Sequence, residues 1–214
     1  LAKHASDAGA DAIAALPPSY FFKPDEIAQV EYYTSIANVS EVPVLIYNIP
    51  QRSGISMTED LYRQLLEVDN IVGMKDSSGD IFSLGHFTSK WKESVIFEGE
   101  DSVLLPGLMA GACGGIGASY SIMPDIYVKL WEAYESKDMD KAAAMQGRAN
   151  EITRALLVAA DLIGGIKQTL AWMGIECGEP RAPNRILTSE ETTNLRNAFE
   201  GVGFFDKQLS GGVS

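Results

Sequence analysis

Short apolar runs alternate with longer amphipathic stretches over the first part of the chain, and this alternation constrains the fold more than any other feature. The runs recur at a spacing of roughly 20–30 residues, which predicts parallel strands joined by helical crossovers. Each run is apolar throughout, which predicts a sheet that is covered on both faces. The predicted strands are 11–16, 43–47, 70–75, 95–98 and 114–120.

Helical patterns fill the connections and then take over the chain. The pattern at Ser56 and Glu59 is that of a capping box, so a helix is expected from there to about residue 68. A second capping box opens the last helix at Thr188. The other predicted helices are 25–39, 81–91, 102–109, 125–134, 139–160 and 163–173.

Two α/β architectures fit this order, a doubly wound open sheet and a (β/α)₈ TIM barrel. No G-x-G-x-x-G follows the first strand, which weakens a dinucleotide-binding sheet. Polar and reactive residues instead follow the strands, and barrel enzymes place their chemistry at that end. These residues are Tyr20, Tyr47, Lys75, Ser119 and the segment 98–101.

The pattern predicts three regions: a partial barrel over residues 1–135, a helical C-terminal extension over 136–207 and a flexible tail over 208–214. The first residue is Leu1, and residues 1–9 have the pattern of the end of an amphipathic helix. We therefore expect that an N-terminal portion precedes this sequence.

Composition excludes several function classes. The net charge of −12 disfavours a nucleic-acid partner, and no basic cluster offsets it. Cys113 and Cys177 lack metal-ligand spacing and the histidines are His4 and His86, so no metal is expected. No run reaches transmembrane length, so no membrane partner is expected. Two isolated cysteines are typical of a cytoplasmic protein without structural disulfides.

Lys75 ends the third predicted strand, between the apolar run 70–74 and the polar turn 76–80. Lysine is almost never fully buried unless it is paired or used. Burial disfavours an ammonium group and favours the neutral amine, which is a nucleophile toward carbonyl carbons. A salt-bridged or snorkelling lysine is the competing interpretation. Tyr47 ends the neighbouring strand, so we expect its hydroxyl within reach of Lys75 as a proton shuttle.

These motifs resemble the dihydrodipicolinate synthase / N-acetylneuraminate lyase family of class I, pyruvate-dependent aldolases. The resemblance implies a (β/α)₈ barrel, with strands 4–8 in this sequence and strands 1–3 upstream of Leu1, followed by helices. The family's pyruvate-gripping loop after strand 2 and its second relay tyrosine after strand 3 would then lie upstream. The matching segments are 9–12, 17–24, 47–54, 73–80, 99–101, 107–119 and 181–183.

The same resemblance implies roles for individual residues. Lys75 corresponds to the Schiff-base lysine, and Tyr47 corresponds to the proton-relay tyrosine. Arg52 corresponds to an arginine that binds the carboxylate of an aldehyde substrate, a task that suits a bidentate guanidinium. Asp101 has a competing interpretation as the N-cap of the helix that follows it. Four further positions are implied substrate contacts: Ser77, Gly99, Asp101 and Ile116, the last through its backbone carbonyl.

The implied function is a lyase that needs no cofactor and acts on small molecules, pyruvate with an aldehyde or a 2-keto acid. Arg52 favours a 4-hydroxy-tetrahydrodipicolinate synthase, whereas the glycine-rich segment 114–117 resembles the corresponding segment of N-acetylneuraminate lyases. A 2-keto-3-deoxy sugar acid aldolase, a non-catalytic pseudoenzyme and an unrelated barrel enzyme with Lys75 as an anion anchor remain alternatives. The resemblance also implies a homo-oligomer, either a dimer or a tetramer.

Overall fold

The structure, a computed structural model, describes residues 1–19 and 23–206. Tyr20 and the predicted tail 208–214 therefore lie outside the described residues. Contacts between residues divide the chain into two compact units, Leu1–Ile116 and Gly117–Ser214. The predicted domain boundary after residue 135 stays a prediction.

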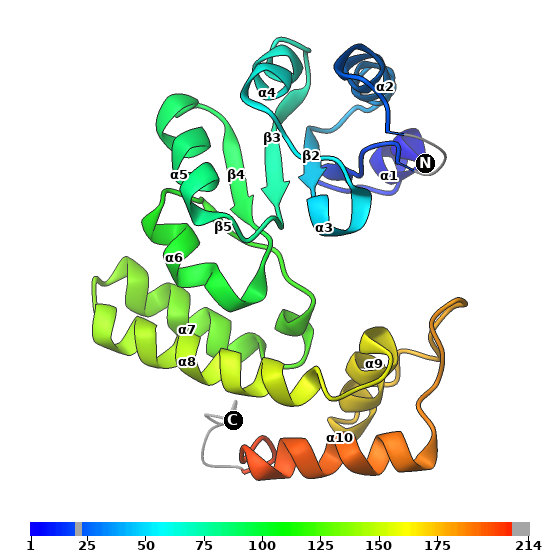
Figure 1. Ribbon diagram of the computed structural model, residues 1–214, viewed down its shortest axis with the longest axis vertical. Coiled ribbons are helices and arrows are strands. Elements are labelled where there is room, and N and C mark those ends of the chain that lie inside the picture. The colour runs from blue at the N-terminus through cyan, green and yellow to red at the C-terminus, as the bar shows by residue number, and fades with distance from the viewer. Residues whose placement is uncertain (20–22, 207–214) are drawn as a thin grey trace. The chain divides into compact units, whose positions relative to one another are not determined.

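The first unit is built on a five-stranded parallel sheet, which confirms the predicted α/β class. The strands pair in sequence order, and the arrows of β2, β3 and β4 point the same way in Figure 1. A doubly wound sheet reverses its strand order, so these strands do not form one. The strands are β1 (Ile13–Ala15), β2 (Val44–Asn48), β3 (Ile71–Asp76), β4 (Val95–Glu98) and β5 (Gly114–Gly115).

The predicted fifth strand, 114–120, is wrong in length, because only Gly114–Gly115 belong to the sheet. Ile116 still donates its N–H to the Glu98 carbonyl at 2.9 Å. The chain then turns into a 3₁₀ segment, η2 (Ser119–Ser121). Glycines offer no side chains to pack across a sheet, which weakens strand propagation here.

The longer helices of the first unit, α2, α4 and α5, begin at polar N-cap residues. Asp25 accepts the N–H of Ala28 at the start of α2. Thr58, not the predicted Ser56, caps α4, because its hydroxyl accepts the N–H of Leu61 at 3.1 Å. The helices are α1 (Ala2–Asp7), α2 (Glu26–Ala37), α3 (Pro50–Ser53), α4 (Glu59–Leu66), α5 (Ile81–Lys90), the 3₁₀ segment η1 (Asp101–Val103) and α6 (Leu104–Met109).

The short helix α3 follows β2 and was not predicted. Pro50 stands at its first position, where its fixed φ suits a helix start. Gly54 ends it in the left-handed conformation, with φ of 69°. The helix carries Arg52 in its last turn.

The core of the first unit lies between one face of the sheet and the helices α2, α4 and α5 (Figure 1). The opposite face is less covered: Lys75 and Phe97 are half-buried, while Ala14 is exposed. The prediction that both faces of the sheet are covered is therefore confirmed in full only for the face that packs against the helices. The largest buried side chains of this core are Tyr33, Tyr62, Ile46, Leu61, Leu65, Met74, Leu84 and Ile96.

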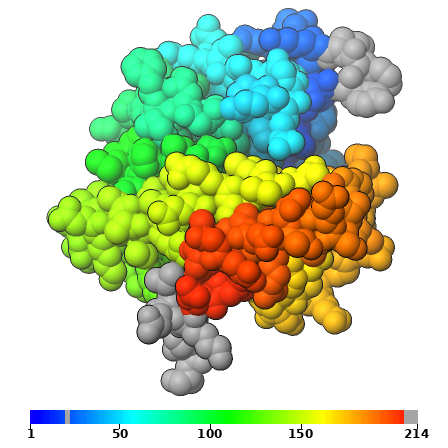
Figure 2. All heavy atoms as spheres, turned by 60° about the horizontal axis from the view of Figure 1, so that its bottom comes forward, coloured from blue at the N-terminus to red at the C-terminus, as the bar shows by residue number. Residues whose placement is uncertain are grey.

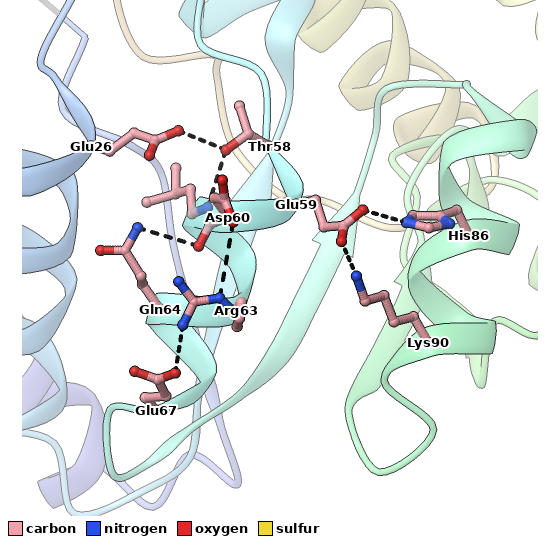
Figure 3. A network of polar contacts seen from close by, with 10 residues as sticks. Glu26, Thr58, Glu59, Asp60, Arg63, Gln64, Glu67, His86 and Lys90 are labelled. Atoms are coloured by element: carbon pink, nitrogen blue, oxygen red, sulfur yellow. Dashed lines mark hydrogen bonds and ion pairs between the residues drawn. The ribbon is translucent and has the colours of Figure 1, made fainter.

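Polar contacts also join these helices on their outer surface (Figure 3). Thr58 donates its hydroxyl to Glu26 Oε1 at 2.7 Å and so links α4 to α2. Glu59 contacts both His86, at 2.8 Å from Nε2, and Lys90, and so links α4 to α5. Exposed ion pairs contribute only about 0–1 kcal/mol each, so the apolar core dominates the packing.

The second unit is helical in its described part. Its helices are α7 (Pro124–Glu135), α8 (Met139–Leu156), α9 (Leu162–Trp172) and α10 (Ser189–Gly201). The predicted capping box at Thr188 is confirmed, with Glu191 as its partner. In Figure 2 α10, in orange to red, lies along the yellow surface of α8 and α9. Within the described residues, none of the helices combines the length and apolar character needed to cross a bilayer.

Candidate active site

Lys75 and Tyr47 meet at the carboxyl end of the sheet, as the sequence predicts. They are register partners on β3 and β2, so their side chains leave the same face. Lys75 Nζ donates to Tyr47 Oη at 3.1 Å. The same Nζ lies 4.2 Å from the centroid of the tyrosine ring. The pair thus joins an amine to a hydroxyl that can pass a proton to or from it.

The surroundings of Lys75 contradict the competing interpretation of a salt-bridged lysine. Within residues 1–19 and 23–206, no carboxylate lies within 4.0 Å of its Nζ. The neighbouring acid in the chain, Asp76, leaves the opposite face of the strand, because side chains alternate along β3. The amine is therefore held by a tyrosine and not neutralised by an acid.

Gly99 and Ser77 lie against Lys75. A Cβ on Gly99 would stand 2.9 Å from Lys75 Cε and would also meet the Ser77 hydroxyl. Ser77 donates that hydroxyl to the Gly99 carbonyl at 2.9 Å, and Gly99 donates its N–H to the Asp76 carbonyl at 2.7 Å. Gly99 therefore borders the Lys75 side chain, and Ser77 lies beside Gly99. These hydrogen bonds connect the loop that follows β3 to the loop that follows β4. A role of Ser77 and Gly99 in binding substrate stays a prediction.

The other predicted residues, Arg52, Asp101 and Ile116, lie in the segments that follow β2, β4 and β5 at the same end of the sheet. Arg52 is exposed on α3, and its guanidinium makes no ion pair within the described part of the chain. Ile116 is 40% exposed just after β5. Asp101 begins the 3₁₀ segment η1, but the cap is Glu100, whose carboxylate accepts the Ser102 N–H. The N-cap interpretation of Asp101 is therefore wrong.

A second cluster was missed from the sequence. Asn48, Asp76 and Glu98 are the last residues of three neighbouring strands, and all three are buried on the helix side. Burial raises the pKa of Asp76 above its ordinary value. Burial, with the nearby Asp76 charge as a smaller cause, raises the pKa of Glu98 to about 7. The available signal was that each of these strands ends on a polar residue that comes two positions after a buried apolar one, Ile46, Met74 or Ile96.

The chemistry that this end of the sheet offers is that of an amine and a hydroxyl. A primary amine next to a proton shuttle can add to a carbonyl carbon and then eliminate water. Across the described ranges, 1–19 and 23–206, no group of three or more His, Cys, Asp or Glu side chains is arranged to hold a metal ion.

Known proteins resemble this chain over nearly its whole length. It is 35% identical to the N-acetylneuraminate lyase of Mediterraneibacter gnavus over 94% of this chain and 65% of that protein. It is 30% identical to the 4-hydroxy-tetrahydrodipicolinate synthase of Archaeoglobus fulgidus over 94% of this chain and 70% of that protein. The chain thus spans about two thirds of the length of the curated relatives that it matches.

The same similarity appears in three dimensions. The structure of a sialic acid aldolase from Ruminococcus gnavus, 33% identical, superposes with a TM-score of 0.89. That match covers 97% of this chain and 70% of the aldolase. A model of the dihydrodipicolinate synthetase family matches residues 1–201. The chain therefore belongs to the dihydrodipicolinate synthetase family.

Proposed function

We propose that this chain carries the Schiff-base centre of a class I, pyruvate-dependent lyase. The observation that carries the proposal is the 3.1 Å contact between Lys75 Nζ and Tyr47 Oη at the carboxyl end of a parallel sheet. The relatives support it, because they are named lyases and synthases of one family. One solved form of the R. gnavus aldolase is described as its catalytic lysine mutant.

Lys75 acts first, as the nucleophile. Its neutral amine attacks C2 of pyruvate, and the carbonyl oxygen takes up a proton to give a carbinolamine. Loss of water then leaves an iminium, whose positive nitrogen draws electrons from the adjacent carbon. Loss of a C3 proton gives an enamine, and C3 of the enamine forms a bond to the carbon of an aldehyde. Hydrolysis of the new iminium releases product and restores Lys75.

Tyr47 supplies the proton transfers that these steps need. Its hydroxyl lies within hydrogen-bond distance of the nitrogen that reacts, so it can move protons between the amine and the carbinolamine oxygen. The reaction uses no cofactor in this proposal, because the protonated imine itself is the electron sink. The reverse sequence cleaves a 2-keto acid to pyruvate and an aldehyde.

The proposed architecture is a (β/α)₈ barrel in which β1 to β5 are strands 4 to 8. The unbroken strand order, and the match of this chain to about two thirds of its relatives, support that assignment. Barrel enzymes bind substrate at the carboxyl ends of their strands, which is where Lys75 lies. We further propose a cytoplasmic homo-oligomer, a dimer or tetramer, as the resemblance implies.

The acceptor aldehyde is proposed to carry a carboxylate, as in a 4-hydroxy-tetrahydrodipicolinate synthase. Arg52 supports this choice, since an exposed guanidinium without an ion pair in the described chain is available to a carboxylate ligand. The alternatives are an N-acetylneuraminate lyase and a 2-keto-3-deoxy sugar acid aldolase. The higher identity to a lyase, 35% against 30% for the synthase, supports the first of these.

Trapping of the imine tests the reaction class. The full-length protein is incubated with pyruvate, reduced with borohydride and digested, and the peptide that contains Lys75 is weighed by mass spectrometry. We expect the mass of a reduced pyruvyl adduct on Lys75, and none on Lys90, an exposed lysine of α5. An unmodified Lys75 would contradict the proposal and favour the anion-anchor or pseudoenzyme alternatives.

A substrate panel then separates the acceptors. Pyruvate with aspartate semialdehyde is compared with the cleavage of sialic acid and of 2-keto-3-deoxy sugar acids. Replacement Arg52→Leu should raise KM for the carboxylated aldehyde by roughly 10²-fold, because a charge-assisted bidentate contact is lost. The imine with pyruvate should be unaffected. An unchanged KM would remove the support that Arg52 gives to the synthase.

A further inference from the structure

The short helix α3 follows β2 at the carboxyl end of the sheet, which is the end that holds the proposed active site (Figure 1). It spans only Pro50–Ser53, far less than the length at which an isolated helix is stable. Its position therefore depends on contacts with the rest of the first unit. The helix matters to the proposed reaction because it carries Arg52, the residue assigned to the acceptor carboxylate.

Both ends of α3 are tied to the rest of the first unit. Before the helix, the carbonyl oxygen of Asn48 accepts the Ser77 N–H at 2.8 Å. After the helix, Ile55 is buried, with 3% of its surface exposed, and it donates its N–H to Ser53 Oγ at 3.2 Å. These contacts fix where the chain leaves β2 and where it returns to the core. Neither of them involves the middle of the helix.

Gln51 supplies the contact in the middle of α3. Its Nε2 donates to the carbonyl oxygen of Ser78, in the loop that follows β3. That loop is held in turn, because the Ser78 N–H donates to the buried Asp76 carboxylate at 3.0 Å. Ser78 Oγ also accepts the Asp80 N–H at 3.1 Å. Gln51 therefore links α3 to the segment that directly follows Lys75 in the chain.

The same link constrains the direction of Arg52. Successive side chains leave a helix roughly 100° apart, so a fixed Gln51 side chain also fixes the rotation of α3 about its axis. Arg52 is exposed, and its guanidinium forms no ion pair within residues 1–19 and 23–206. The direction in which Arg52 leaves the helix is therefore set by the backbone and not by an acidic partner.

We propose that Gln51 is a positioning residue: its hydrogen bond to Ser78 holds α3 in the orientation in which Arg52 meets the acceptor carboxylate. This inference rests on the proposed function, because it takes Arg52 as the group that binds that carboxylate. Gln51 itself does not contact substrate in this role. Lys75 and Tyr47 lie on paired strands, so imine formation with pyruvate should not need Gln51.

Steady-state kinetics of the full-length protein with pyruvate and aspartate semialdehyde tests this role. Gln51→Met keeps the length of the side chain but cannot donate a hydrogen bond. Its KM for aspartate semialdehyde should rise about three- to fivefold, the effect of one lost hydrogen bond at an exposed position. The value of kcat and the borohydride adduct on Lys75 should be unchanged.

Gln64→Met is the matched control. Gln64 also donates its Nε2 to a backbone carbonyl, that of Asp60, but it does so on the outer surface of α4 (Figure 3). Its KM for aspartate semialdehyde should equal that of the wild type. A rise in KM as large as that of Gln51→Met would contradict a specific role for the contact between Gln51 and Ser78.

A double-mutant cycle distinguishes positioning from a general structural effect. In an Arg52→Leu background the guanidinium is absent, so Gln51→Met should raise the acceptor KM no further. The inference would be overturned by an equal rise in both backgrounds, or by no rise in the wild-type background.

Hydrogen exchange adds a readout that does not depend on turnover. The N–H groups of residues 52–54 donate to the carbonyls of Ile49 and Pro50. These amides should exchange faster in Gln51→Met than in the wild type, because the helix opens more easily. Unchanged exchange would overturn the inference. If the wild type forms no imine, the proposed function fails; a wild-type imine with an unchanged KM in Gln51→Met removes the inference about Gln51 alone.

Discussion

The two faces of the sheet differ sharply at its carboxyl end. One face presents Tyr47 and Lys75, half-buried and in contact with each other. The other presents Asn48, Asp76 and Glu98, buried under helices. Each of these buried residues comes one position after a residue whose side chain lies on the first face. Because side chains alternate between the two faces of a strand, this offset alone places the two groups on opposite faces. The comparison teaches how acids can lie next to a reactive lysine in sequence without forming the ion pair that would neutralise it.

The largest expected effect comes from removing the amine of the reactive face. Lys75→Arg keeps a cation but loses the nucleophile, so kcat/KM should fall by at least about 10⁴-fold and the borohydride adduct should vanish. Thermal unfolding should change little, because the lysine is half-buried and unpaired by acids. A variant that unfolds instead would show that Lys75 supports the fold and not only the chemistry.

Removing the hydroxyl partner should have a smaller effect. Tyr47→Phe keeps the ring beneath Lys75 Nζ but loses the proton shuttle, so kcat should fall by about 10²–10³-fold. The matched control is Tyr62→Phe on the helix side, where the lost hydroxyl contacts Ser94. That control should lower stability and leave kcat unchanged. Equal losses of kcat in the two variants would contradict the assignment of proton transfer to Tyr47.

Gly99 tests how tightly the lysine is placed. In Gly99→Ala the new methyl group would overlap the Ser77 hydroxyl and stand 2.9 Å from Lys75 Cε, so both side chains must move and kcat/KM should fall by about 10²-fold. Gly147→Ala is the control, because a Cβ there meets nothing within 4 Å on helix α8. It should stabilise the protein slightly and preserve activity. Steady-state kinetics with denaturation curves measures both, and a fully active Gly99→Ala would refute the tight placement.

The buried face should make stability depend on pH. The pKa of Glu98 is raised from 4.5 to about 7, so the folded state binds more protons than the unfolded state between these values. Its contribution is therefore complete below about pH 4.5 and is lost as pH rises through about 7, a change on the order of 3 kcal/mol. Urea denaturation of the wild type should show this decline, and Glu98→Gln should reduce it. A decline of the same size in both proteins would exclude Glu98 as its source.

An exposed acid gives the smallest effect and sharpens the contrast with Glu98. Glu59→Gln weakens the contacts to His86 and Lys90 that Figure 3 shows. Because these groups are about half-exposed, the free energy of unfolding should fall by only about 0.5 kcal/mol, and salt should erase the difference. Urea denaturation at low and high salt checks this. If the free energy of unfolding fell as much as it does when a buried polar group is removed, the view that the apolar core dominates helix packing would be contradicted.

Much of the reactive face could be predicted from the sequence. Parallel strands end at one edge of a sheet, so residues at the ends of consecutive strands become neighbours, and Lys75 and Tyr47 followed from that rule. The strand order agrees for the same reason, since each helical crossover connects adjacent strands.

The buried face could not be predicted, because its residues look like the start of a loop. Asp76 follows Lys75 and Glu98 follows an apolar run, and both precede turn residues, where polarity alone favours exposure. Only the packing of α6 over Glu98 encloses it. The cap at Thr58 was missed for a related reason, since Ser56 also satisfies the sequence pattern and only backbone geometry distinguishes the two.

The narrow space around Lys75 has a consequence for binding entropy. A lysine side chain has four rotatable bonds, and ordering one costs up to about 2 kcal/mol. Here the Tyr47 ring lies beside Nζ, and Gly99 borders Cε, so the chain orders its lysine when it folds. In the proposed reaction, pyruvate meets an amine whose direction is already set, so the conformational cost of imine formation falls on folding instead of on catalysis.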